Sequence, residues 1–575
     1  MRFYCALGLL FSLAVSASAI DRDAFTFTNY DLKMQIEPEQ QRLATDGTIT
    51  LRNDSGSAQR NVSLQISSSL GWRAIRFEGQ PVQFLTQTYT SDIDHTGVLS
   101  EAIVTLPREV APGGTVSLNV RYEGVISQDA TRLTRIGVPA DQARQSDWDQ
   151  ISESFTGVRG VGYVVWYPVA MDAVSLSDGN SVFDALNHWR ERETQATMRL
   201  TISRSESEQP ARFLCNASDG EKESAAAGQA SLPQTDCFYA PLGLTVPLFV
   251  IGNYKELREQ EINVSYLAGH DSAAQSYAMA AEKVAPFVRG WFGAPKLQAE
   301  IVDLPDSQAA PYESGAILLI PLDSVDPKLA EVSAVHQLTH AAFPSDRNWI
   351  FEGLAHFAQA VYVESQSGRQ AALDSMAPHR AAIINAEKAL PPGSAADTST
   401  EQSLINTSTE EFYRSKAMYV WWMLRDMVGE PALKRALAAY RPQEDKSPSY
   451  VQKLIEAQSH LDLEWFFDDW VYRDRGLPDF EVKTIYPRRI LPSGYMVTVT
   501  IENLGAAGAE VPITLQFADG ERMRRIDVHG KAEASIRFEI PSLPEKVLVN
   551  DGSVPESNMT NNEAKVTVAA PAEEP

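Results

Sequence analysis

Residues 336–355 read HQLTHAAFPSDRNWIFEGLA, and this stretch decides how the chain is interpreted. His336 and His340 are four residues apart, so on a helix both side chains point from one face and can bind one metal ion. Glu352 follows on the next expected helix, where its carboxylate can supply a third ligand and leave a fourth position open. Two imidazoles, one carboxylate and an open position are typical of a catalytic zinc site. The pattern predicts one zinc ion per chain, and the alternative is two ordinary histidines packed in a core.

Gln337 stands directly after the first histidine. In hydrolytic sites with this histidine spacing, a glutamate at that position is the general base. A carboxamide has nearly the shape of a carboxylate but no useful basicity. Loss of a general base typically costs about 10²–10⁴-fold in rate. We therefore expect a site that keeps its metal ligands while its hydrolytic activity is weakened, with Gln337 at the catalytic position.

Length and charge limit the possible functions. The chain has 575 residues, which is too long for a single hydrophobic core and indicates several domains. Its hydrophobic content of 44% is that of a globular protein. The formal net charge of -25 argues against a nucleic-acid partner, because phosphate binding needs a clustered positive field.

The first nineteen residues resemble a signal peptide. Arg2 precedes an apolar run at 6–15, and Ala17-Ser18-Ala19 is a small-residue cleavage site. We expect residues 1–19 to be removed and the protein to be exported, either periplasmic or secreted. No later stretch is long and apolar enough to predict a membrane span. Removal of residues 1–19 leaves Cys215 and Cys237, which we expect to form a disulfide in an oxidising compartment; two buried free thiols are the alternative.

The hydrophobic pattern changes twice along the chain. Residues 20–255 show alternation, as in Tyr30-Leu32-Met34-Ile36, and predict an antiparallel β domain. Residues 256–478 predict helices mixed with strands, and one helix, opened by Asp326-Pro327, carries both histidines. Residues 479–568 return to alternation and predict an immunoglobulin-like β-sandwich. Residues 569–575 are predicted to be a disordered tail.

These motifs resemble the gluzincin aminopeptidases, the aminopeptidase N family. In that family the zinc histidines are followed by a Trp-x-x-Glu-Gly-x-Ala segment whose glutamate is the third ligand, and residues 349–355 match it. A Tyr-x-Lys-Gly-Ala helix is similar to residues 413–417, and a Gly-x-Pro end is similar to Gly476-Leu477-Pro478. The resemblance covers roughly residues 25 to 480, with its specific motifs in 310–480.

The resemblance implies an N-terminal antiparallel β-saddle, a thermolysin-like α+β zinc-peptidase domain and metal-assisted hydrolysis of peptide bonds. It also implies a peptide or protein substrate. The family's oxyanion-binding tyrosine corresponds to Tyr413, with Tyr419 as the second choice. The family's amine-binding glutamate corresponds to Glu313, within Tyr312-Glu313-Ser314-Gly315-Ala316, although a solvated glutamate at a strand edge is an alternative.

The chain departs from the family pattern at several points. Gln337 replaces the general base, and eleven residues separate His340 from Glu352 where the family has eighteen. Tyr413 lies three residues before Lys416, where the family has two, and the family's large helical domain is missing. Two further hypotheses stay open: a zinc-binding pseudopeptidase that acts as a peptide-binding or scaffold module, and an adhesion-like multidomain protein. His356, one helical turn after Glu352, is either a neighbour of the site or a surface residue.

Overall fold

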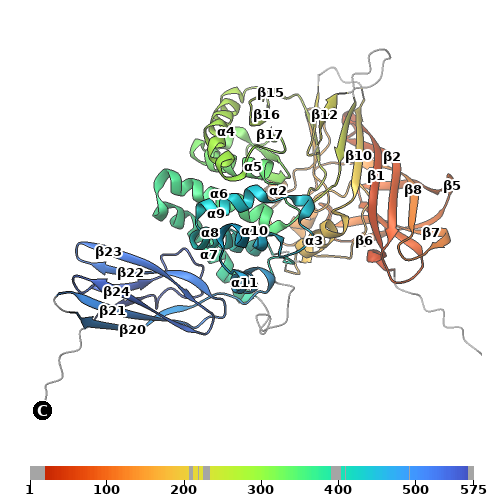
Figure 1. The fold of residues 1–575 in the computed structure, drawn as a ribbon. Coiled ribbons are helices and arrows are strands. Elements are labelled where there is room, and N and C mark those ends of the chain that lie inside the picture. The colour runs from red at the N-terminus through yellow and green to blue at the C-terminus, as the bar shows by residue number, and fades with distance from the viewer. Residues whose placement is uncertain are drawn as a thin grey trace, which may run out of the picture.

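The computed structural model describes residues 20–179, 181–205, 211–217, 219–223, 234–389, 403–407, 409–490 and 493–566. The expected signal peptide and the expected C-terminal tail lie outside these residues. The chain forms an N-terminal β-rich part, a central part rich in helices and a C-terminal part of two small sheets (Figure 1). No helix in the described ranges is both long and apolar enough to cross a membrane.

The N-terminal part is built on an eight-stranded sheet whose strands lie in the order β12-β13-β10-β1-β2-β8-β4-β5. Its alternating pattern buries one face, and Tyr30, Leu32, Met34 and Ile36 of β1 are at most 1% exposed. The strands are β1 (Phe25–Glu37), β2 (Arg42–Asn53), β4 (Leu70–Phe77), β5 (Gln80–Pro81), β8 (Thr115–Val125), β10 (Thr197–Arg204), β12 (Asp219–Glu223) and β13 (Gln234–Tyr239).

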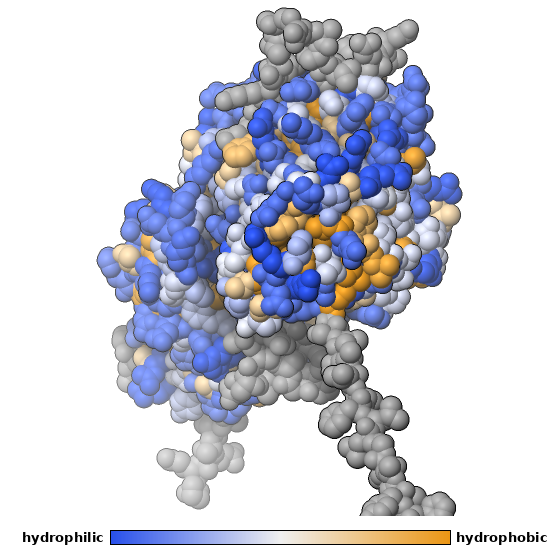
Figure 2. Space-filling model, turned by 90° about the vertical axis from the view of Figure 1, so that its right-hand side faces the viewer, coloured by the Kyte–Doolittle hydropathy of each residue, from blue (hydrophilic) through white to orange (hydrophobic). Residues whose placement is uncertain are grey.

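Two three-stranded sheets complete this part. One has the order β3-β7-β6, from β3 (Gln59–Ser67), β7 (Val98–Val110) and β6 (Gln83–Thr90). The other has the order β11-β14-β9, from β11 (Arg212–Cys215), β14 (Phe249–Gly252) and β9 (Phe155–Val158). Figure 2 views the molecule from this side and shows an apolar area framed by hydrophilic side chains.

Within the described residues, one strand pair of the N-terminal part departs from the expected antiparallel β domain. β1 pairs with β10 in parallel, from Asn29 opposite Thr197 to Ile36 opposite Arg204. A parallel pair needs a long crossover, and the chain between β1 and β10 provides one. That crossover contains the helices α1 (Thr131–Arg135), α2 (Ala140–Ser146) and α3 (Ser181–Glu193).

The central part has a five-stranded sheet with the order β15-β16-β17-β19-β18. The inner strands β16, β17 and β19 are parallel, and β15 and β18 are antiparallel edge strands. The strands are β15 (Lys255–Arg258), β16 (Ile262–Tyr266), β17 (Ala299–Asp303), β18 (Tyr312–Ser314) and β19 (Ile317–Ile320).

Helices make up the rest of the central part (Figure 1). A π-helical turn, Glu411–Lys416, leads into α8, and such turns are frequent at functional sites. The helices are α4 (Asp271–Phe292), α5 (Pro327–Ala342), α6 (Asn348–Ser367), α7 (Arg369–Ala389), α8 (Ala417–Val428), α9 (Glu430–Ala439), α10 (Tyr450–Ser459) and α11 (Glu464–Phe467).

The C-terminal part consists of two sheets, β20-β21-β24 and β23-β22-β25-β26. Their buried side chains belong to the same apolar cluster as the helices, and Trp470 donates from Nε1 to the carbonyl oxygen of Gly508 at 2.7 Å. The strands are β20 (Phe480–Arg489), β21 (Tyr495–Asn503), β22 (Ala509–Phe517), β23 (Gly520–Val528), β24 (Glu533–Ile540), β25 (Lys546–Val549) and β26 (Glu563–Lys565).

A disulfide joins Cys215 of β11 to Cys237 of β13, with 6.4 Å between the Cα atoms. The next residue, Asn216, donates from Nδ2 to the carbonyl oxygen of Val246 at 2.8 Å and to Oγ of Ser314 at 2.9 Å. Asn216 Oδ1 in turn accepts from the hydroxyl of Tyr239 at 2.8 Å. The disulfide therefore braces the residue that ties the N-terminal part to β18 of the central sheet.

We predict that replacing Cys215 and Cys237 together by serine lowers the free energy of unfolding by about 3 kcal/mol. The reason is the conformational entropy that the unfolded chain regains when a loop of this size is no longer closed. Denaturant unfolding of both forms measures the difference. Two titratable thiols in the unreduced wild-type protein would show that the bond does not form in solution.

Candidate metal centre

Helix α5 places His336 and His340 side by side in the interior. The two side chains are 7% and 0% exposed, and their Nε2 atoms lie 3.0 Å apart. The rings meet edge to face with 4.6 Å between centroids. The spacing of four residues thus brings both Nε2 atoms to one point, as the sequence predicts for a helix.

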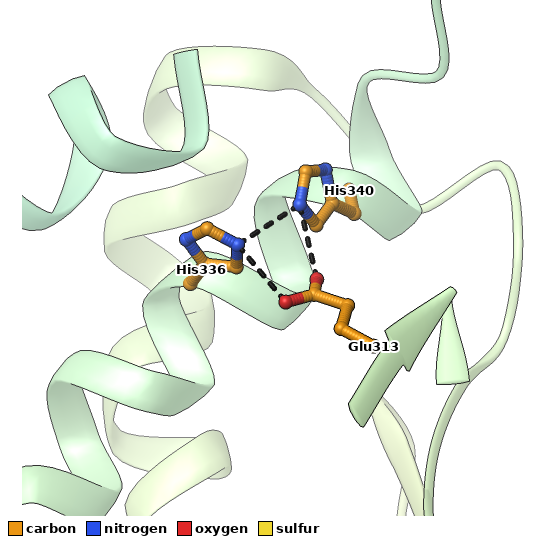
Figure 3. Close-up of side chains that lie close together, drawn as sticks. All are labelled: Glu313, His336 and His340. Carbon is orange, nitrogen blue, oxygen red and sulfur yellow. Dashed lines mark hydrogen bonds and ion pairs between the residues drawn. The ribbon is translucent and has the colours of Figure 1, made fainter. Parts of the chain in front are cut away.

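Glu313 reaches the same point from β18. Gly315-Ala316 forms a two-residue hairpin turn between β18 and β19. Such a turn requires a positive φ at its first central residue, and Gly315 has φ +63° there. The Glu313 carboxylate lies 3.0 Å from Nε2 of His340 and 3.2 Å from Nε2 of His336 (Figure 3). Ligand atoms of Glu313, His336 and His340 all lie within 4.8 Å of one another.

The Glu313 carboxylate and the neighbouring imidazoles act on each other electrostatically. Burial alone would raise the pKa of Glu313, but the charges of His336 and His340 and their hydrogen bonds hold that pKa well below its usual value. Burial by itself would lower the pKa of His336. The charge of the neighbouring Glu313 carboxylate and its hydrogen bond together raise this pKa above its usual value. In this state the carboxylate is the counter-charge of the histidine pair.

The donor set fits a zinc ion. Zn–N and Zn–O bonds of about 2.0–2.2 Å at tetrahedral angles place neighbouring ligand atoms about 3.3–3.5 Å apart. The observed separations among His336, His340 and Glu313 are 3.0–3.2 Å, so an ion needs only small outward movements. A group of two histidines and one glutamate in this arrangement can bind a metal.

Glu352, the third ligand predicted from the sequence, lies beside this group but outside it. Its Oε1 is 3.9 Å from Nε2 of His340, and its Oε2 accepts a hydrogen bond from Nε of Arg414 at 3.0 Å. Arg414 stands on the π-helical turn and also pairs with Glu410. To bind a metal, Glu352 has to move toward the histidines and weaken its ion pair with Arg414.

Gln337 is buried on α5, at 1% exposure. Its Oε1 atom has no hydrogen-bond partner within the ranges that the structure describes. Together with Glu313, His336 and His356, Gln337 lines a cavity of about 350 Å³. Gln337 therefore lies in the interior beside the histidine pair. At the position where the sequence predicts the general base, the side chain is an amide.

The two candidate tyrosines have different surroundings. Tyr413 is buried and lines a second, larger cavity that Glu313 and Glu352 also line. Burial raises its pKa to about 12, so the hydroxyl keeps its proton at neutral pH. Tyr419 donates its hydroxyl to the carbonyl oxygen of Met376 at 3.1 Å, which commits it to the core of the helices.

His356 is not a free surface residue. Its ring lies against that of His336, with 4.9 Å between centroids, and its Nδ1 is 3.0 Å from Oε1 of Gln359. Burial, followed by the charges of His336 and Arg414, holds its pKa well below the usual value. His356 thus stays neutral at pH 7 and packs against one side of the histidine pair.

The larger cavity has a volume of about 470 Å³ and lies between the N-terminal and central parts. Glu313, Glu352, Tyr413 and Arg414 line it from the central part, and α3 lines it from the N-terminal part. Glu313 and Arg414 also line the 350 Å³ cavity around Gln337. The acidic side chains beside the histidines are therefore open to a space that fits a small ligand.

Sequence reasoning missed three features of this site: the approach of Glu313 to the histidines, the ion pair between Arg414 and Glu352, and helix α3. The first two depend on the packing of distant segments and leave no local pattern. Helix α3 does leave one, because Val182, Leu186 and Trp189 recur at helical spacing within residues 181–193.

Comparison with known proteins gives distant structural neighbours. No family model matches the chain, and no protein with a curated description matches it. The M1 zinc metallopeptidase from Deinococcus radiodurans is 17% identical, and the alignment covers 80% of this chain and 96% of that chain with a TM-score of 0.46. A mutant of that enzyme bound to a Tyr-Ser-Ala substrate has the same identity and coverage and a TM-score of 0.47. Similarity at this level does not place the chain in a family.

We predict that the purified protein binds about one zinc per chain and that His340→Ala abolishes this binding. Loss of a residue that only hydrogen-bonds a metal ligand typically weakens metal binding by about 10–100-fold. Glu313→Gln should weaken zinc binding by more than this, because Glu313 faces both imidazoles. Glu352→Gln should weaken it less while Arg414 retains its other partner, Glu410. Competition with a chromophoric chelator measures the affinities. His379→Ala is the matched control and should retain full zinc, whereas stoichiometric zinc in His340→Ala would rule out this site.

Proposed function

We propose that this chain is an exported zinc-binding protein of metallopeptidase type that binds peptides and hydrolyses them weakly. The observation that carries this proposal is the convergence of His336, His340 and Glu313 beside a cavity that also contains Tyr413 and Glu352. Imidazole and carboxylate donors next to a ligand-sized space are what metal-assisted hydrolysis requires. The disulfide and the signal-like residues 1–19 support the proposed export.

His336 and His340 would hold the metal together with a carboxylate. Glu313 faces both Nε2 atoms in this structure, and Glu352 takes the role if it leaves Arg414. Bound zinc supplies a Lewis acid that polarises a carbonyl group and makes water more acidic. Whichever of the two glutamates is not a ligand remains at the cavity as a negative group, which suits the protonated amine of a peptide.

The remaining residues orient the substrate and handle protons. The Tyr413 hydroxyl, protonated at neutral pH, is a preorganised donor for the oxygen of a peptide carbonyl in the cavity. Gln337 can donate or accept a hydrogen bond but cannot remove a proton from an attacking water. The proposed site can therefore bind a peptide and polarise its carbonyl group, but it lacks a general base.

A pseudopeptidase is the second candidate function, and two observations favour it. Gln337 stands at the position where a general base is expected, and Arg414 holds Glu352 in an ion pair. In such a protein the zinc stabilises the site and the cavity binds a peptide without cleaving it. Turnover separates the two candidates, because both predict zinc and peptide binding.

We predict that Gln337→Glu raises the hydrolysis of aminoacyl and short peptide substrates by at least about a hundredfold, the low end for a general base. The two side chains are close in volume, so folding should change little. Steady-state rates on a panel of substrates measure the gain, which should vanish when His340→Ala is added.

Gln359→Glu is the matched control, because Gln359 lines the same small cavity but is not next to the histidines in sequence. It should leave hydrolysis low. A Gln337→Glu protein that folds, binds zinc and cleaves nothing across the panel would favour the pseudopeptidase.

A further inference from the structure

Helix α3 closes the 470 Å³ cavity from the N-terminal side. A second face of α3 packs against the N-terminal sheet. Trp189 on this face is 2% exposed, and Oε1 of Glu193 accepts a hydrogen bond from the backbone N–H of Phe27 at 3.0 Å. Arg192 also bonds this face, through the carbonyl oxygen of Phe25. Asn187 and Arg190 of the same helix line the cavity.

Arg190 differs from the other arginines that line the cavity. Arg132 pairs with Asp147 at 2.8 Å, and Arg414 pairs with Glu352 at 3.0 Å. In the part of the chain that the structure describes, Arg190 forms no ion pair, and its Nε is buried without a hydrogen-bond partner. Its guanidinium has one weak side-chain contact, 3.4 Å from NH1 to Oδ1 of Asn187. A guanidinium that is partly withdrawn from water and lacks a carboxylate is poised to bind an anion.

The charge of Arg190 acts on the Tyr413 hydroxyl, which faces the proposed peptide. Burial raises the pKa of Tyr413 to about 12, and the charge of Arg190 works in the opposite direction. Arg190 lines the cavity from α3, whereas Glu313 and Glu352 line it from the central part. The cavity thus has an acidic side at Glu313 and Glu352 and a cationic side at Arg190.

We propose that Arg190, supported by Asn187, binds the terminal α-carboxylate of a short peptide in this cavity. This inference rests on the proposed function and names its substrate class: di- and tripeptides with both ends free. The protonated amine faces the glutamate that does not bind the metal, and the carboxylate forms the two parallel hydrogen bonds that a guanidinium fork offers. A volume of about 470 Å³ matches a ligand of that size.

The experiment uses the full zinc-loaded protein and two probes, trialanine and trialanine amide, with binding measured by calorimetry. The wild-type protein should bind the free acid at least about tenfold more tightly than the amide, since a charge-assisted bidentate contact is lost in the amide. Arg190→Gln should weaken binding of the acid by a similar factor and leave binding of the amide unchanged. Arg192→Gln, on the opposite face of α3, should preserve the preference for the acid.

The outcomes separate this inference from the function on which it rests. Equal binding of acid and amide by the wild-type protein would overturn the role of Arg190 and leave peptide binding intact, and this comparison needs no variant to fold. Binding of neither peptide by the zinc-loaded protein would overturn both proposals. Arg190-dependent binding of inorganic phosphate that is tighter than that of trialanine would assign the site to phosphate anions and overturn the peptide assignment.

Discussion

The Nε2 atoms of His336 and His340 lie 3.0 Å apart in the protein interior, so the protons between them decide what else the site must hold. One proton between them gives an N–H···N hydrogen bond. Two protons repel each other unless one acceptor faces both, and two bare lone pairs repel each other unless a cation lies between them. Either a cation between them or a carboxylate facing both resolves the conflict. Glu313 does so in this structure, and a zinc ion would do so with Glu313 or Glu352 as the third ligand. Helix α5 and strand β18 supply the side chains that meet this requirement here, and α6 places Glu352 beside them.

The requirement also explains why the N-terminal part belongs to the site. Glu313 stands on an edge strand, and an edge strand alone would fix its side chain poorly. The next residue, Ser314, receives a hydrogen bond from Asn216, which follows the disulfide at Cys215. The N-terminal part then adds α3 over the larger cavity. The proposed metal ligands of the central part and the proposed substrate-facing groups of the N-terminal part therefore depend on one interface.

The sequence predicts the elements that are set by local patterns. Period-two alternation indicates the β-rich ends of the chain, and the spacing of His336 and His340 predicts one helix with both side chains on one face. The position of Glu313 was not predictable in the same way, because it depends on a hairpin turn and on how β18 packs near α5. The same holds for Arg414 and Glu352, which are 62 positions apart in the sequence. The one missed feature with a local signal is α3, which the alternation of its neighbours obscured.

The most direct test of the central claim is a crystal structure of the zinc-loaded protein measured at the zinc absorption edge. The account predicts one anomalous peak between the histidines, about 2.0–2.2 Å from Nε2 of His336, Nε2 of His340 and one carboxylate oxygen. The Glu313 carboxylate should no longer bridge two bare imidazoles. A zinc-saturated crystal with no peak at this position, and with Glu313 still facing both rings, would show that the histidine pair is a buried ion-pair cluster and not a metal centre.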